Sequence, residues 1–163
     1  DADFENHISA ARLLPHPSLI VRRSFGKPYG LPGVRLGFLL AADTLAERMR
    51  TMLGAWPVGT AAIAIGCQAL ADRQWLDQQK TRLDSDIRRF FDLCRRSSLS
   101  VAGQTRLFTL VRTSKAADLW VHLCRHGIVT RVFPERPADI RFGLPRSEME
   151  WRRLGHALCE WET

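Results

Sequence analysis

The sequence has no apolar stretch long enough to cross a membrane. A spanning helix needs about 20 consecutive, mostly apolar residues, and no run here approaches that length. The opening residues, DADFENHISA, also lack a basic region followed by an apolar one, which is the pattern of a secretory signal peptide. We therefore expect a cytoplasmic protein with no membrane partner.

Paired cysteines are also missing. The chain has four cysteines, Cys67, Cys94, Cys124 and Cys159, and no C-x-x-C pair among them. This wide spacing fits neither a zinc site built on thiolates nor a dense disulfide framework. We expect reduced thiols, as in a cytosolic protein, and no metal.

Basic side chains are in excess, but they are not concentrated. The formal net charge is +7 and the isoelectric point about 10.0, which raises nucleic acid as a partner. However, the arginines are scattered beside acids, and the sequence has no basic strand with interleaved aromatics of the RNA-binding type. We attribute the charge to a solvated face or to anionic small molecules and do not expect a nucleic-acid partner.

Periodicity and turn residues predict a mixed α/β chain, because 45% of the residues are hydrophobic and helical and strand patterns alternate. In the first half, the pattern predicts a strand over 19–24, a largely buried strand over 34–42, a helix from the N-cap Asp43 to Gly54, and helix over 60–96 with a break near Asp72. In the second half, it predicts strands over 107–111, 128–132 and 140–142, a helix over 115–126 that ends at Gly127, and a last helix opened by a capping box at 147–150. We interpret the five tryptophans as core and lobe-interface residues.

A lysine lies in a loop of glycines and prolines, SFGKPYGLPGVRLGF over 24–38. A lysine with a lowered pKa can form a Schiff base with an aldehyde, and glycines let the backbone approach a bulky cofactor. Ser24 offers a hydroxyl donor and Arg35 a forked, permanent charge, so both suit one phosphate. Taken alone, Lys27 would be read as an ordinary surface lysine, Ser24 as a turn former and Arg35 as a strand-end residue.

Together these residues suit pyridoxal 5'-phosphate, an aldehyde cofactor that carries a phosphate. Its pyridine nitrogen must stay protonated for the ring to act as an electron sink, and this requires a carboxylate partner. Asp1, in DADF upstream of the first strand, is the candidate.

The order D-x-x-F, then S-F-G-K-x-Y-G-L-x-G-x-R-L-G-F, then R-F-G-L-P resembles the aminotransferase class I/II family of fold-type I pyridoxal-phosphate enzymes. SFGK and RFGLP followed by E-x-x-W-x-R-L are most similar to the branch that decarboxylates L-threonine O-3-phosphate in cobalamin biosynthesis. The aminotransferases of histidinol phosphate resemble the chain next. The likeness corresponds to the second half of such enzymes. It implies the C-terminal part of the fold: the end of the large cofactor domain over 1–58, a connecting helical segment over 59–98, and a small α/β lobe over 99–163.

The resemblance implies a role for six residues. Lys27 would form the internal aldimine, Ser24 and Arg35 would bind the cofactor phosphate, and Asp1 would pair with the pyridinium nitrogen. Arg141 would bind the substrate carboxylate and Arg131 the substrate phosphate. These six residues would serve decarboxylation and transamination equally. A non-catalytic module is a third alternative. The resemblance also implies a homodimer and a phosphorylated amino acid as substrate.

Two further expectations follow. His122 and His126 are spaced i, i+4, as in zinc-binding pairs, but no H-E-x-x-H pattern or evident third ligand accompanies them, so we interpret both as helix-surface histidines. Because the resembling enzymes use donors from their first half and from a dimer partner, we expect this chain by itself to bind cofactor weakly and to turn over poorly or not at all.

Overall fold

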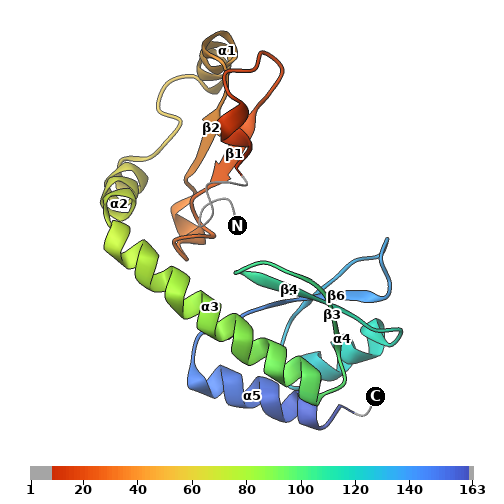
Figure 1. Cartoon of the computed structure of the whole chain (residues 1–163). Helices are drawn as coiled ribbons and strands as arrows, with labels where there is room; N and C mark the ends of the chain where they lie inside the picture. The colour runs from red at the N-terminus through yellow and green to blue at the C-terminus, as the bar shows by residue number, and fades with distance from the viewer. Residues whose placement is uncertain (1–8, 162–163) are drawn as a thin grey trace. The chain divides into compact units, whose positions relative to one another are not determined.

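The computed structural model describes residues 9–161, which belong to two compact units, Asp1–Gln79 and Lys80–Thr163 (Figure 1). We call them the N-terminal and the C-terminal unit and describe each by itself. The boundary between them falls within one long helix, α3. No helix among the described residues has the length and apolar character that crossing a bilayer requires.

The N-terminal unit is built around a two-stranded antiparallel hairpin. Strands β1 and β2 pair with Val21 opposite Leu40 and Ser24 opposite Gly37, so the loop of 25–36 joins their adjacent ends. The elements in order are η2 Ala10–Leu13, β1 Val21–Ser24, η3 Pro32–Val34, β2 Gly37–Leu40, α1 Asp43–Leu53, α2 Thr60–Ala71 and the start of α3 Arg73–Arg96.

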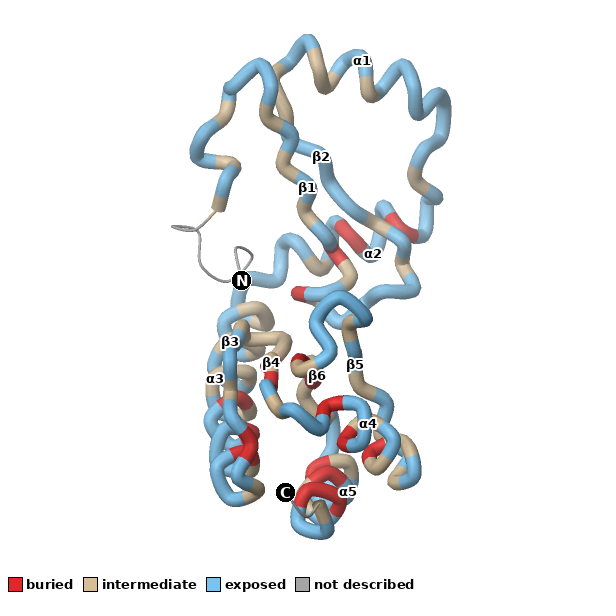
Figure 2. Tube along the Cα trace, turned by 90° about the vertical axis from the view of Figure 1, so that its right-hand side faces the viewer, coloured by how far each residue is buried: buried red, intermediate tan, exposed pale blue. Residues whose placement is uncertain are grey.

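The C-terminal unit is a four-stranded antiparallel sheet with helices packed against it. The strand order is β3-β4-β6-β5, and the core joins alternate residues of β4 and β6 to side chains of α3, α4 and α5. Phe90, Val111, Leu119 and Ile140 have no solvent exposure, and the buried positions gather on these elements in Figure 2. The remaining bounds are β3 Ser100–Gln104, β4 Phe108–Arg112, α4 Ala116–Arg125, β5 Arg131–Val132, β6 Asp139–Gly143 and α5 Glu148–Cys159.

Several predicted breaks are confirmed, and each has a local cause. The helical stretch divides at Asp72, whose carboxylate accepts a hydrogen bond from the Trp75 amide at 2.9 Å. Gly54 and Gly127 both adopt positive φ angles just after a helix, which glycine does at low cost. Ser147 caps α5 by accepting from the Glu150 amide.

Other expectations are wrong. Ala42, not Asp43, is the N-cap of α1, and Asp43 is the first helical residue, where its charge lies near the positive end of the helix dipole. Strand β3 was not expected, because its sequence SVAGQ is poor in strand-forming residues. Strand β2 was expected to be largely buried, yet all four of its residues are exposed. Among the described residues it belongs to a two-stranded sheet with β1. Trp56 is 93% exposed and belongs to no core.

Candidate active site

The loop between β1 and β2 is anchored by aromatic stacking. Phe25 is 1% exposed, and its ring stacks on Tyr29 with centroids 4.7 Å apart. Tyr29 in turn stacks on Trp75 at 5.8 Å. Large aromatic rings lose little conformational freedom when they pack, so this stack holds the turn of 26–29 in which Lys27 lies.

Gly26 is required by the packing of this loop on itself. A Cβ atom at position 26 would lie 2.8 Å from the Pro32 Cα and 3.3 Å from the Pro32 nitrogen. These neighbours are backbone atoms, which cannot rotate aside as a flexible side chain can. The absence of a side chain at position 26 therefore lets the turn with Lys27 lie directly against helix η3.

The loop and the hairpin line one open pocket of about 980 Å³, and Ser24, Lys27 and Arg35 all contribute to it. The three residues that the sequence singled out in this segment therefore line the same pocket. Arg22 and Arg23 line the same pocket, and the described residues around it include no acidic side chain. Four cationic side chains around one pocket favour an anionic ligand, since charged groups seek a partner of opposite sign.

Arg35 is held in an uncommon backbone conformation. Its φ and ψ angles are 56° and 39°, the left-handed region that costs a non-glycine residue roughly 1–2 kcal/mol. One guanidinium nitrogen donates to the Pro32 carbonyl at 3.1 Å. A guanidinium carries five N–H donors, so the remaining donors can serve an anion in the pocket.

Arg131 and Arg141 are brought together in the C-terminal unit. They are directly opposite residues of the β5–β6 pair, which places both side chains on one face of the sheet. The Arg141 guanidinium lies 4.2 Å from the Phe108 ring centroid, and both arginines lie over Phe133, at 5.7 and 6.0 Å. Within residues 9–161 no carboxylate pairs with either of them.

This pair is electrostatically unfavourable by itself, because like charges directly opposite one another destabilise a sheet. The aromatic rings beneath offset part of that cost through cation–π attraction. A ligand with two negative groups would offset the rest. Phosphate and carboxylate on one small molecule are such groups, as the resemblance implied for these two positions.

The other predicted position cannot be placed. Asp1, expected to pair with the cofactor nitrogen, lies outside the described residues. So does Phe4 of the D-x-x-F motif.

Sequence reasoning missed Arg22 and Arg23 as lining residues of the pocket. Side chains of adjacent residues normally lie on opposite faces of a strand, yet both of these residues line the pocket. The position of both directly before Ser24 was the signal that could have suggested them.

Comparison with known proteins places the chain in a family. The model of the "aminotransferase class I and II" family matches residues 1–158. The chain belongs to the aminotransferase class I and II family. Its fold is the C-terminal part of a fold-type I enzyme of that family, with the end of the large domain, a long helix and a small α/β lobe, as the sequence predicted.

Two relatives with known names illustrate the similarity. A threonine-phosphate decarboxylase of Pseudomonas aeruginosa is 42% identical over 150 residues, which are 92% of this chain and 45% of the relative. A histidinol-phosphate aminotransferase of Staphylococcus saprophyticus is 30% identical over 81% of this chain and 37% of the relative. The chain spans about half the length, or less, of these relatives.

Solved structures of the family superpose well. The histidinol-phosphate aminotransferase of Sinorhizobium meliloti, in complex with pyridoxal-5'-phosphate, has a TM-score of 0.81 and 24% identity over 92% of this chain and 43% of that one. A putative aminotransferase of Burkholderia pseudomallei has a TM-score of 0.77 and 29% identity over 86% of this chain and 44% of that one. Both agree with the fold described above.

Proposed function

We propose that the protein containing this chain is a pyridoxal-phosphate enzyme that decarboxylates L-threonine O-3-phosphate to aminopropanol phosphate and CO₂ in cobalamin biosynthesis. The observation that carries this proposal is the pocket in which Ser24, Lys27 and Arg35 meet under a cationic lining. The similarity to threonine-phosphate decarboxylases supports the choice of substrate. It is a proposal for the whole protein, which functions as a cytoplasmic homodimer.

The pocket residues fit the cofactor. Arg35 and Ser24 would hold its phosphate, and Lys27 would bond to its aldehyde carbon. Gly26 keeps the loop backbone close to η3, so that the lysine stem starts from a fixed point. When bound, pyridoxal phosphate supplies an electron sink for the pair of electrons left when a bond at the substrate Cα breaks.

The arginine pair would orient the substrate. Arg141 would bind the α-carboxylate and Arg131 the phosphate, because a guanidinium fork matches both groups. Their opposite placement on β5 and β6 fixes the separation of the two anionic groups. Orientation by these two arginines would decide the chemistry, because it would select which bond at the substrate Cα is broken.

Lys27 would serve as the proton carrier. In decarboxylation the Cα–carboxylate bond breaks, CO₂ leaves, and a proton is returned to Cα. In transamination Lys27 would instead take the Cα proton and deliver it elsewhere, and a 2-oxo acid would be needed to complete the cycle. General acid–base assistance of this kind contributes about 10²–10⁴-fold to a rate.

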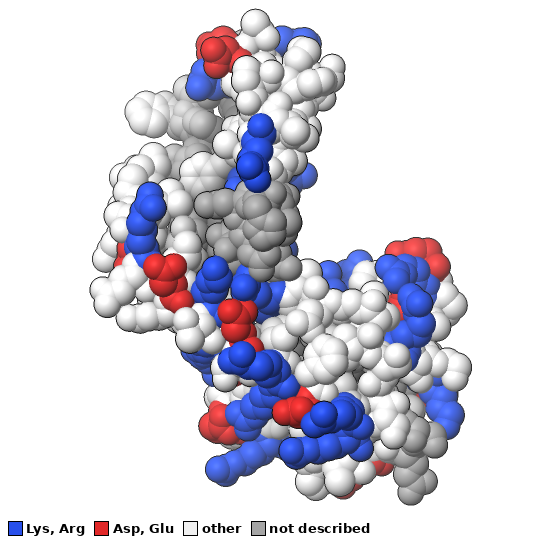
Figure 3. Space-filling view, in the orientation of Figure 1, with Lys and Arg blue, Asp and Glu red and all other residues white. Residues whose placement is uncertain are grey.

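An aminotransferase acting on histidinol phosphate is the second candidate, favoured by the relatives of that name. A tight pair between Arg141 and the substrate carboxylate also stabilises the ground state, which slows loss of CO₂. A non-catalytic module that uses its positive charge to bind nucleic acid is the third reading. In Figure 3, however, acidic side chains are interspersed among the basic ones, as in the α3 ion pair of Arg95 with Asp92 at 2.9 Å.

The deciding experiment uses the full-length protein. We expect borohydride reduction with pyridoxal phosphate, followed by peptide mapping, to label Lys27 and not Lys80 or Lys115. We expect CO₂ release from L-threonine O-3-phosphate without a 2-oxo acid. Turnover of histidinol phosphate that requires a 2-oxo acid would replace the decarboxylase by the aminotransferase. No label on Lys27, together with salt-sensitive DNA binding, would overturn both enzymatic readings.

A further inference from the structure

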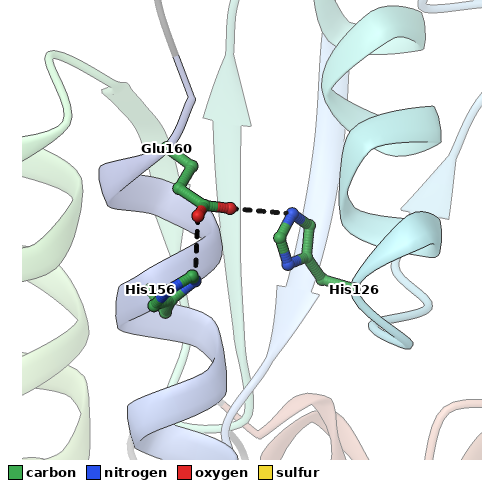
Figure 4. Close-up of side chains that lie close together, drawn as sticks. All are labelled: His126, His156 and Glu160. Atoms are coloured by element: carbon green, nitrogen blue, oxygen red, sulfur yellow. Dashed lines mark ion pairs between the residues drawn. The ribbon is translucent and has the colours of Figure 1, made fainter.

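A second cluster of ligand-type side chains lies in the C-terminal unit, away from the residues assigned to catalysis. His126, His156 and Glu160 come from the ends of α4 and α5, and their donor atoms all lie within 4.8 Å of one another. Figure 4 shows the Glu160 carboxylate between the two imidazole rings, with one oxygen directed at each. The proposed reaction uses none of these three residues.

Two separations within the cluster, both to Glu160, match those of ligands around one metal ion. The His126 Nε2 atom lies 3.3 Å from one Glu160 oxygen, and the His156 Nδ1 atom lies 3.5 Å from the other. Zinc binds nitrogen and carboxylate oxygen at about 2.0–2.2 Å in tetrahedral geometry, so two of its ligands lie roughly 3.3–3.6 Å apart. Each histidine is therefore at ligand spacing from Glu160, and one ion could bind all three residues once the two imidazoles, whose donor atoms lie within 4.8 Å of each other, close on it.

The backbone holds His126 in place. His126 is the C-cap of α4, and the helix ends there in a Schellman motif: the Gly127 amide donates to the Cys124 carbonyl and the Ile128 amide to the Leu123 carbonyl, both at 2.9 Å. The other two ligands, His156 and Glu160, are four residues apart at the end of α5, and residues at this spacing lie on the same face of a helix.

The surroundings favour a cation. His126 and Glu160 are the C-cap residues of two helices, and the negative end of a helix dipole attracts positive charge. Beside the cluster, the His122 Nε2–H donates to the Ala157 carbonyl at 2.8 Å, which ties α4 to α5. The His122 ring packs on His126 with centroids 4.7 Å apart, so the His126 ring has limited freedom to turn away.

We propose that His126, His156 and Glu160 form a binding site for a divalent first-row transition metal, with zinc as the expected ion. Two imidazoles and a carboxylate are a ligand set that zinc accepts in proteins, with water in the fourth position. The ion clips the end of α4 to the end of α5 and stabilises the C-terminal unit. It takes no part in the chemistry at Lys27.

The test is calorimetric titration of the full-length protein with ZnCl₂, and with CoCl₂ followed by visible absorbance. We expect one saturable site per chain that involves these residues. His126→Gln, His156→Gln and Glu160→Gln should each weaken it more than about tenfold, since loss of even an outer-shell partner costs about 10–100-fold. Saturating zinc should also raise Tm, because a ligand that binds only the folded state stabilises it, and the three variants should lose this rise.

Matched controls separate this site from others. His16→Gln removes an exposed histidine of the N-terminal unit, and Cys159→Ser removes the exposed thiol next to Glu160; both should bind zinc like the wild type. No zinc binding tighter than about 1 mM, or binding that survives all three ligand variants, overturns the proposal. The proposal is also overturned if Cys159→Ser abolishes zinc binding and the cobalt spectrum of the wild type shows a thiolate charge-transfer band. If the variants change stability at low pH without metal and zinc has no effect, the cluster is an ion-pair network instead.

Discussion

Trp151 in the C-terminal unit is 4% exposed, whereas Trp56 in the N-terminal unit is 93% exposed. Phe90 of α3 and Phe38 of β2 make a second such pair, fully buried and 40% exposed, although Phe25 of the N-terminal unit is also buried. The C-terminal unit closes a core around its own helices and sheet. The N-terminal unit instead displays apolar side chains together with the cationic pocket of Lys27. Most of the exposed large apolar side chains of the described residues thus lie in the N-terminal unit, and the extended core lies in the C-terminal unit.

The largest expected effect is at Lys27. Lys27→Ala in the full-length protein should lower turnover by at least about 10³-fold, because under the proposed function it would remove both the bond to the cofactor and the proton carrier. Hydrogen exchange of the β4 and β6 amides should not change. Lys115→Ala, in the other unit, is the matched control and should leave turnover near that of the wild type. Equal losses in both variants would contradict the assignment of the chemistry to the N-terminal unit.

Truncating one phenylalanine in each unit compares their cores. Phe90→Ala should lower the free energy of unfolding of the C-terminal unit by about 3–5 kcal/mol, as for other buried aromatic truncations. Phe38→Ala in the 163-residue chain should cost less than about 1 kcal/mol. Hydrogen exchange in denaturant measures both. A cost at Phe38 as large as that at Phe90 would show that β2 is covered.

Acid should weaken the C-terminal unit through Asp139. This carboxylate is buried on β6, and the hydrogen bond from Arg112 is the main cause that lowers its pKa. A lowered folded-state pKa gives stability that is present above the unfolded pKa, near 3.9, and is lost as the pH falls through the folded value. Unfolding of the C-terminal unit should therefore become easier below about pH 4.

Asp139→Asn tests this cause. The variant should be less stable than the wild type at neutral pH and should show a smaller further loss on acidification. The exposed Asp43→Asn change in the N-terminal unit is the control. An unchanged pH profile in Asp139→Asn would mean that other carboxylates carry the acid sensitivity.

The smallest expected effect is at a helix cap. Ser147→Ala should destabilise the C-terminal unit by about 1 kcal/mol, because the hydroxyl accepts from the Glu150 amide at the start of α5. Asp43→Ala should cost α1 only a few tenths of a kcal/mol through the helix dipole, since Asp43 is the first helical residue and not the N-cap. Thermal unfolding monitored by circular dichroism distinguishes the two. A loss of stability in Ser147→Ala no larger than that in Asp43→Ala would contradict the role of Ser147 as a helix cap.

Local signals in the sequence predicted the elements that depend on local interactions. The break at Asp72, the end of α1 at Gly54 and the cap at Ser147 each involve residues within a few positions. Exposure of β2 was not predictable, because an apolar run reads as buried whether or not the chain supplies the layer that covers it. Strand β3 was missed because its pairing with β4, and not its own composition, makes it a strand.

The residues of the candidate site also differ in whether local sequence could predict that they lie together. Ser24, Lys27 and Arg35 lie within twelve residues and were predicted together. The facing of Arg131 and Arg141 depends on the register of β5 and β6, which the sequence does not fix. The convergence of His126 with His156 and Glu160 depends on how α4 packs on α5, so sequence reasoning saw only the His122 and His126 pair.

Gly26 has a genetic consequence. Any replacement brings a Cβ atom against the backbone of Pro32 and moves the segment that bears Lys27. In a library of random substitutions this position should tolerate none, although its residue offers no side chain to a ligand. An inactivating substitution at position 26 would therefore have the same effect on activity as the loss of Lys27, although Lys27 itself would still be present.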